Sequence, residues 1–167
     1  MAEFRPERIL AVLAEQRVDY VMIGGLAATI HGSDLVTFDI DITPATDDEN
    51  LARLSRALDE LDARIRTRDA PDGLPFAHDA ASLARATVWN LVTNAGDLDL
   101  AMMPDGTQGY DDLRRDAIAI TIIGIPTRVA ALADVSRPKE AAGREKDRAA
   151  LPMLRRLQNE IARRERL

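Results

Sequence analysis

The chain has 167 residues, a length typical of one domain with a single hydrophobic core. Its net charge of −6 argues against nonspecific coating of nucleic acid, and the absence of cysteine excludes disulfides and thiolate metal sites. No apolar run approaches the roughly 20 residues needed to cross a bilayer, and the N-terminus lacks the apolar stretch of a signal peptide. We therefore expect a cytoplasmic protein without a membrane partner.

The first elements predicted along the chain are helices and strands in alternation. Pro6 suits the first turn of a helix that runs to about residue 16. An apolar strand at 20–23 leads into a short helix at 25–32, and a second strand follows at about 36–42.

The second strand carries two aspartates on one face. Alternate residues of a strand point the same way, so Asp39 and Asp41 lie together. The same alternation predicts that Phe38, Ile40 and Ile42 point the opposite way, into the core.

A helix and a long loop are predicted next. Residues 46–49 have the pattern of a capping box, with Thr46 as the cap, and a helical stripe of four leucines follows: Leu51, Leu54, Leu58 and Leu61. Residues 63–67 suit a short strand. The segment 68–83 is rich in Asp, Pro, Gly and Ala and predicts a mobile loop.

A β-hairpin is predicted from two strands, at about 86–92 and 97–103, joined by a turn that ends in glycine. Asp97 and Asp99 share one face of its second strand. Asp97 follows the turn, so we expect it to be more solvated and mobile than Asp99, which has leucine on both sides.

The rest of the chain predicts a helical turn at 111–115, short strands at 118–123 and 127–130, and two helices that begin at Pro138 and Pro152. The fold class is therefore α/β: a small mixed sheet with flanking helices and a helical C-terminus.

Gly24, Gly25 and the aspartate pair together indicate nucleotide chemistry. Two glycines at a strand-to-helix turn let backbone N–H groups approach a phosphate, and the helix N-terminus favours negative charge there. Asp39 and Asp41 supply the carboxylates that hold a divalent metal ion.

This pattern resembles the nucleotidyltransferase superfamily, whose fold is shared with DNA polymerase β. The family signature is an apolar residue, Gly-Gly or Gly-Ser, a gap of about a dozen residues, and Asp-x-Asp between apolar residues; here 13 residues separate Gly25 from Asp39. The chain is more similar still to small prokaryotic members that include abortive-infection and toxin-type enzymes, through Gly24–Ala27 and His31–Ser33.

The resemblance implies a transferase that moves a nucleoside monophosphate from a nucleoside triphosphate, such as ATP, to a hydroxyl group. It implies Mg²⁺ or Mn²⁺, with two ions, held by Asp39, Asp41 and Asp99, and Asp99 as the base on the acceptor. The acceptor is left open among tRNA, protein and small molecules, and a cognate antitoxin or toxin is an implied partner. Residues 1–136 would form the catalytic core, and residues 137–167 a helical segment packed on the same domain.

The C-terminal segment 137–167 is basic, with ten Lys or Arg against five Asp or Glu. The resemblance implies that Lys139, Arg144 and Lys146 contact the nucleotide phosphates; alternatively they only pair with neighbouring acidic residues. The two lysines, seven residues apart, are expected to share one helical face. Thr37 shares the face of Asp39, where it either hydrogen-bonds substrate or serves only as a strand residue.

Two other functions fit parts of the pattern. Asp39–Thr43 also matches the Asp-x-Asp-x-Thr motif of haloacid-dehalogenase-type phosphatases, but that motif leaves the two glycines unexplained. A non-catalytic binding partner or antitoxin with the same fold is the second alternative, and the intact set of three aspartates argues against it.

Overall fold

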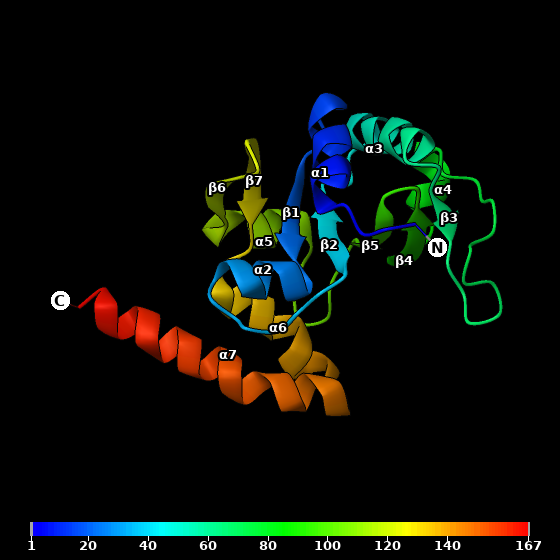
Figure 1. Ribbon diagram of the computed structural model, residues 1–167. Helices are drawn as coiled ribbons and strands as arrows, with labels where there is room; N and C mark the ends of the chain where they lie inside the picture. The colour runs from blue at the N-terminus through cyan, green and yellow to red at the C-terminus, as the bar shows by residue number, and fades with distance from the viewer. Residues whose placement is uncertain (1, 167) are drawn as a thin grey trace.

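The computed structural model, which describes residues 2–166, is built on one seven-stranded mixed sheet (Figure 1). The strands follow the order β3-β4-β5-β2-β1-β7-β6. Neighbouring strands run antiparallel except in the pairs β2–β5 and β1–β7, which are parallel. The strand bounds are β1 Tyr20–Ile23, β2 Asp39–Pro44, β3 Arg64–Ile65, β4 Val88–Thr93, β5 Gly96–Ala101, β6 Ile118–Ile122 and β7 Ile125–Val129.

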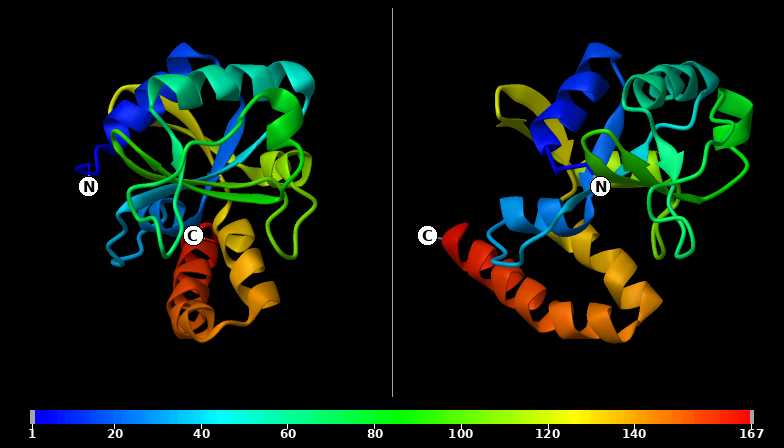
Figure 2. Two further views of the ribbon diagram at one scale, coloured as in Figure 1. Left: turned by 90° about the vertical axis from the view of Figure 1, so that its right-hand side faces the viewer. Right: turned by 45° about the vertical axis from the view of Figure 1, so that its right-hand side comes forward.

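Helices cover both faces of the sheet (Figures 1 and 2). Helices α1 and α3 lie on one face, while α2, α6 and α7 lie on the other, and the C-terminal half of α7 projects beyond the sheet. The helix bounds are α1 Pro6–Glu15, α2 Gly24–Ile30, α3 Asp48–Glu60, α4 Ala80–Leu83, α5 Tyr110–Asp116, α6 Leu132–Ala142 and α7 Glu145–Arg164. The predicted α/β class with a mixed sheet and a helical C-terminus is confirmed.

Strand alternation divides the two central strands into an apolar and an acidic face. Ile40 and Ile42 of β2 and Leu98 and Leu100 of β5 are fully buried in the core. The residues that precede each of these four on the same strands are aspartates, and all of them are only partly buried: Asp39, Asp41, Asp97 and Asp99. The residues that build the core thus hold the carboxylates on the opposite face of the sheet.

The α3 helix packs on this core through the predicted stripe, since Leu51, Leu54, Leu58 and Leu61 are all buried. Its N-terminus differs from the prediction. The cap is Asp47, whose carboxylate accepts a hydrogen bond from the Asn50 N–H, and not Thr46. Both residues are typical of caps, so the pattern alone leaves the first turn uncertain by one residue.

The prediction for the start of β2 was wrong by three residues. The strand begins at Asp39, and the segment 33–38 before it has no regular secondary structure. Phe38 consequently lies outside the sheet and is 72% exposed, contrary to the expected core position. Ile40 and Ile42 point into the core as predicted.

The two C-terminal helices begin earlier than predicted. Pro138 and Pro152, which were expected to start them, lie inside α6 and α7. Each proline removes one backbone hydrogen bond of its helix. The break between the helices falls at Gly143, which has a left-handed backbone with φ of +60°. Lys139 and Lys146 therefore belong to different helices, and the expectation that they share one helical face was wrong.

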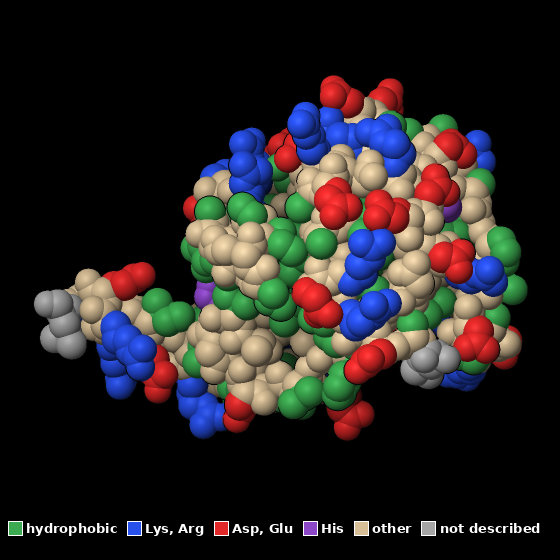
Figure 3. All heavy atoms as spheres, turned by 45° about the horizontal axis from the view of Figure 1, so that its top comes forward, with side chains coloured by type: hydrophobic (Ala, Val, Ile, Leu, Met, Phe, Trp, Pro, Cys, Tyr) green, Lys and Arg blue, Asp and Glu red, His purple; other side chains and the backbone are tan. Residues whose placement is uncertain are grey.

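Within residues 2–166, none of the helices is long and apolar enough to cross a bilayer. The surface formed by α1 and α3 mixes basic, acidic and apolar side chains (Figure 3). Arg8 on α1, for example, pairs with Glu60 on α3 at 3.0 Å. This surface therefore lacks the single-sign character that attracts polyanions.

Candidate active site

Three carboxylates meet on the acidic face of the central strands. Asp41 of β2 lies opposite Asp99 of β5 in the parallel register, and Asp39 precedes Asp41 on the same face. Ligand oxygens of Asp39, Asp41 and Asp99 all lie within 4.8 Å of one another. Asp97 pairs with Asp39 in the register but does not belong to this group.

The glycine turn lies directly against one of these carboxylates. Gly24 has φ of +71°, and a Cβ on it would lie 2.7 Å from Cγ of Asp41. Real Cβ atoms do not approach other atoms so closely, so this position requires glycine both for its backbone conformation and for space. The turn and the β2 carboxylate thus form one compact unit.

Gly25 and Thr37 lie beside the same unit. A Cβ on Gly25 would be 3.0 Å from Oγ1 of Thr37. The Thr37 hydroxyl donates a hydrogen bond of 2.5 Å to Oδ1 of Asp39. Thr37 therefore orients the Asp39 carboxylate, although it precedes the strand.

Crowding makes the ionised carboxylates unfavourable in the absence of a cation. Burial and, to a smaller extent, the negative charges of Asp39 and Asp99 together raise the pKa of Asp41 to about 7, although the positive charges of Lys139 and Lys146 act to lower it. Burial also raises the pKa of Asp99, and the Arg66 guanidinium opposes this rise. A divalent cation among the three side chains would reverse the effect by favouring their charged forms.

Arg66 is a member of the site that the sequence analysis missed. It follows β3, and its guanidinium bridges the two hairpin aspartates. Nη1 pairs with Asp97, and Nη2 donates to both oxygens of Asp99 at 3.1 and 3.3 Å. The side chain of Asp97 is 34% exposed and that of Asp99 18%, so Asp97 is the more solvated, as expected, but it is tied to Arg66.

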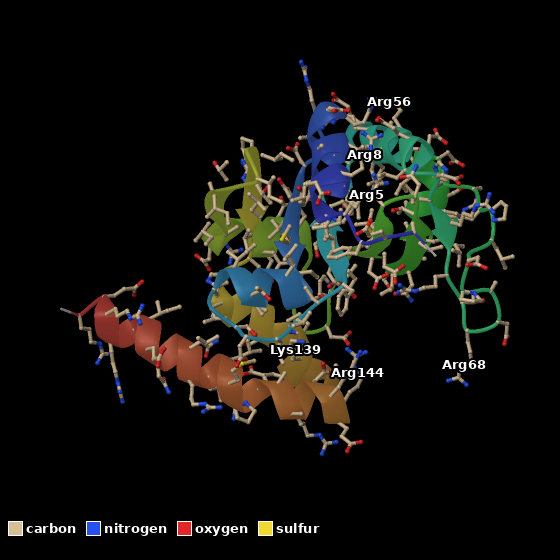
Figure 4. All side chains as sticks on the ribbon, viewed as in Figure 1. Arg5, Arg8, Arg56, Arg68, Lys139 and Arg144 are labelled. Carbon is tan, nitrogen blue, oxygen red and sulfur yellow. The ribbon has the colours of Figure 1, made fainter. Side chains whose placement is uncertain are left out.

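The basic residues predicted at the C-terminus lie near the α6–α7 turn. Figure 4 shows Lys139 and Arg144 at this end of the molecule, while Arg5, Arg8 and Arg56 lie over the α1–α3 face. Lys139 and Lys146 are close enough to lower the pKa of Asp41.

Arg144 is engaged with its own helix. Its Nε donates to the buried carboxylate of Asp147 at 2.7 Å. Burial is the largest single influence on Asp147 and acts to raise its pKa, but the hydrogen bond from Arg144 and the positive charges of Arg144, Lys139 and Lys146 together outweigh burial, so the pKa is lowered. Arg144 thus does pair with a neighbouring acidic residue, while its contact with nucleotide phosphates stays a prediction.

Two cavities of about 500 and 670 Å³ lie away from the carboxylates. They are lined by residues at the other end of the sheet, such as Asp19 and Tyr20 for the smaller one, and Asp47 and Met102 for the larger. The three aspartates line neither of them.

Comparison with known proteins gives a match in structure only. No family model matches the chain, and no curated protein is significantly similar in sequence. The crystal structure of TM1012 from Thermotoga maritima, itself an inferred nucleotidyltransferase, is similar with a TM-score of 0.53 and 19% identity, covering 95% of this chain and 97% of that one. The solution structure of the antibiotic-resistance factor ANT(2'')-Ia has a TM-score of 0.48 and 17% identity, covering 78% of this chain and 65% of that one.

The match to TM1012 extends over nearly the whole length of both chains. The chain therefore shares the nucleotidyltransferase-like fold of TM1012.

Proposed function

We propose that the protein is a metal-dependent nucleotidyltransferase, which transfers a nucleoside monophosphate from a nucleoside triphosphate to a hydroxyl-bearing acceptor. The observation that carries this proposal is the convergence of Asp39, Asp41 and Asp99 within 4.8 Å, with Gly24 packed against Asp41. A fold alone does not fix an activity, but this set of side chains supplies what phosphoryl chemistry requires.

The three carboxylates fit Mg²⁺ or Mn²⁺. Both ions prefer oxygen ligands, and the raised pKa of Asp41 indicates a position at which a cation relieves repulsion. Asp39 and Asp41 would be shared by two ions and Asp99 would hold one of them. Such ions would neutralise charge on the triphosphate and on the attacking oxygen.

The triphosphate is proposed to lie between the glycine turn and the α6–α7 turn. The backbone N–H groups at Gly24 and Gly25 would donate to phosphate oxygens. Lys139 and Lys146, whose charges already act on Asp41, would bind the same phosphates from the other side. Arg144 would take part only by giving up its bond to Asp147, and Thr37 would keep Asp39 in place.

The acceptor hydroxyl is proposed to approach on the side of Asp99. Its oxygen attacks the α-phosphorus, the bond to the β-phosphate oxygen breaks, and pyrophosphate leaves. The Asp99 carboxylate accepts the hydroxyl proton. The phosphatase alternative leaves Gly24 and Gly25 unexplained and requires a lysine before its later acidic motif, whereas Lys139 and Lys146 both follow the hairpin aspartates, so it is less well supported.

The acceptor and the biological role are further parts of the proposal. tRNA, a protein and a small molecule are the acceptor classes to be distinguished, and a cognate toxin or antitoxin is the partner that such a role would require. To identify the acceptor, the protein would be incubated with each α-labelled nucleoside triphosphate, Mg²⁺ or Mn²⁺, and total cell lysate. Label in an RNA, protein or small-molecule fraction identifies the acceptor class. Absence of label with every nucleotide would favour the non-catalytic alternative.

A further inference from the structure

Arg66 approaches the Asp99 carboxylate from the β3–β4 edge of the sheet, on the side of β5 that is opposite to β2. Its backbone N–H donates to the carbonyl of Asn90 at 2.9 Å, and Asn90 lies opposite Asp99 in the β4–β5 register. Neighbouring strands are about 4.8 Å apart, so the Arg66 side chain passes over the position of Asn90 to reach Asp99. The guanidinium then contacts Asp99 on the side away from β2.

This contact leaves Asp99 free to bind a second partner. A carboxylate has about four lone-pair positions, and Nη2 of Arg66 uses one on each oxygen, at 3.1 and 3.3 Å. An oxygen of the same carboxylate remains within 4.8 Å of ligand oxygens of Asp39 and Asp41. A guanidinium fixes a carboxylate through planar, directional bonds, in a way that a point charge does not.

Asp97 completes the arrangement by holding the other end of the guanidinium. It pairs with Nη1 and lies two residues from Asp99 on the same face. Arg66 thus spans both hairpin aspartates, and of these two only Asp99 belongs to the group whose ligand oxygens lie within 4.8 Å of one another.

We propose that Arg66 is a positioning residue, anchored by Asp97, which holds the Asp99 carboxylate in the orientation that binds a divalent metal ion. This inference rests on the proposed function. It assigns to Asp97 a role through Arg66 and not as a metal ligand. Partners that orient metal ligands typically change metal affinity by about 10- to 100-fold when they are removed.

The test measures Mn²⁺ binding to the whole chain, without nucleotide, by calorimetry or by electron paramagnetic resonance. Arg66→Gln makes the site more negative and Asp97→Asn makes it less negative, so an effect of charge alone changes the affinity in opposite directions. Positioning predicts that both variants bind Mn²⁺ about 10-fold more weakly. Arg66→Lys keeps the charge but cannot bridge two carboxylates, and it should also bind more weakly than the unmodified chain.

Arg64→Gln is the matched control. Arg64 lies two residues before Arg66 at the same edge of the sheet, and it pairs with Asp62 at 3.8 Å and not with the carboxylate site. The Mn²⁺ affinity of the Arg64→Gln variant should match that of the unmodified chain. The melting temperature of each variant is measured as well, to check that a loss of Mn²⁺ binding is not caused by unfolding. Equal or tighter Mn²⁺ binding by Arg66→Gln, or full recovery in Arg66→Lys, would overturn the inference. Absence of Mn²⁺ binding by the unmodified chain would instead contradict the proposed function itself.

Discussion

Gly24 and Asp41 are in such close contact that no side chain fits between them: a Cβ on Gly24 would lie 2.8 Å from the Cβ of Asp41. The two residues come from different elements, α2 and β2. The contact explains why a glycine turn and an aspartate pair occur together in this chain, since the turn must leave room for the carboxylate. It also changes the expected effect of substitutions at the turn.

Gly24→Ala should remove activity by displacing Asp41, and not only by blocking phosphate. The φ of +71° adds strain, and we expect a loss of about 1–3 kcal/mol in unfolding free energy. Mn²⁺ affinity should fall together with transfer. Gly124→Ala is the control, because Gly124 also has a positive φ, of +78°, but has open space around its Cβ position. Unchanged Mn²⁺ affinity in Gly24→Ala would show that the contact has no influence on the carboxylate.

Asp39→Asn and Asp41→Asn should each lower transfer by about 100-fold or more, because each removes a ligand charge without changing size. Circular dichroism should show an intact fold, since both side chains are only partly buried and asparagine has nearly the same size as aspartate. Transfer rates within a few-fold of the unmodified chain in both variants would contradict the assignment of these residues.

The raised pKa of Asp41 predicts a pH dependence of stability in the absence of metal. The folded chain holds a proton on Asp41 up to about pH 7, whereas the unfolded chain releases it near about pH 4. The folded state therefore binds more protons in this window, and its stability falls as the pH rises from about 4 to about 7. Urea denaturation in EDTA should show this fall.

Asp41→Asn removes the titrating group, so it should reduce that fall and stabilise the metal-free protein at about pH 8. Added Mn²⁺ should raise the melting temperature of the unmodified chain more at about pH 8 than at about pH 5, because protons compete for the carboxylates. If the stability of Asp41→Asn falls with rising pH as much as that of the unmodified chain, groups other than Asp41 dominate the pH dependence of stability.

Asn50 should be the most sensitive polar position outside the site. It is fully buried and its amide donates to the carbonyls of Asp19 and Ala45 at 2.9 and 2.7 Å, while it accepts from the Asp19 N–H at 2.7 Å. Asn50→Ala leaves these backbone groups without partners and should lower the unfolding free energy by about 2–4 kcal/mol. Asn159→Ala, at an exposed position of α7, should change it by less than about 0.5 kcal/mol. Similar urea midpoints for the two variants would contradict the role of this network.

Local patterns predicted the parts of the site that depend on strand alternation. The spacing of Asp39 and Asp41, with isoleucines between them, is enough to place both carboxylates on one face. The parallel pairing of β2 with β5 then brings Asp99 beside Asp41. That pairing joins residues far apart in sequence, and only the resemblance to a family suggested it.

Arg66 was missed because its partners lie more than 30 residues away. The sequence signal is the alternation of Arg64, Arg66 and Arg68, a spacing that would place three arginines on one face of a strand, although β3 itself ends at Ile65. The errors at Pro138 and Pro152 have a different cause. Proline is most common in the first turn of a helix, and tertiary packing here outweighs the loss of one hydrogen bond in each helix.

The most direct test of the central claim compares two labelled forms of the same nucleoside triphosphate in the presence of Mn²⁺ and the acceptor fraction. If the protein transfers nucleotides, label at the α-phosphate enters the acceptor, label at the γ-phosphate leaves as pyrophosphate, and Asp39→Asn abolishes both. Transfer of the γ-label to the acceptor, or label incorporation that persists in Asp39→Asn, would contradict nucleotidyl transfer at the Asp39–Asp41–Asp99 site.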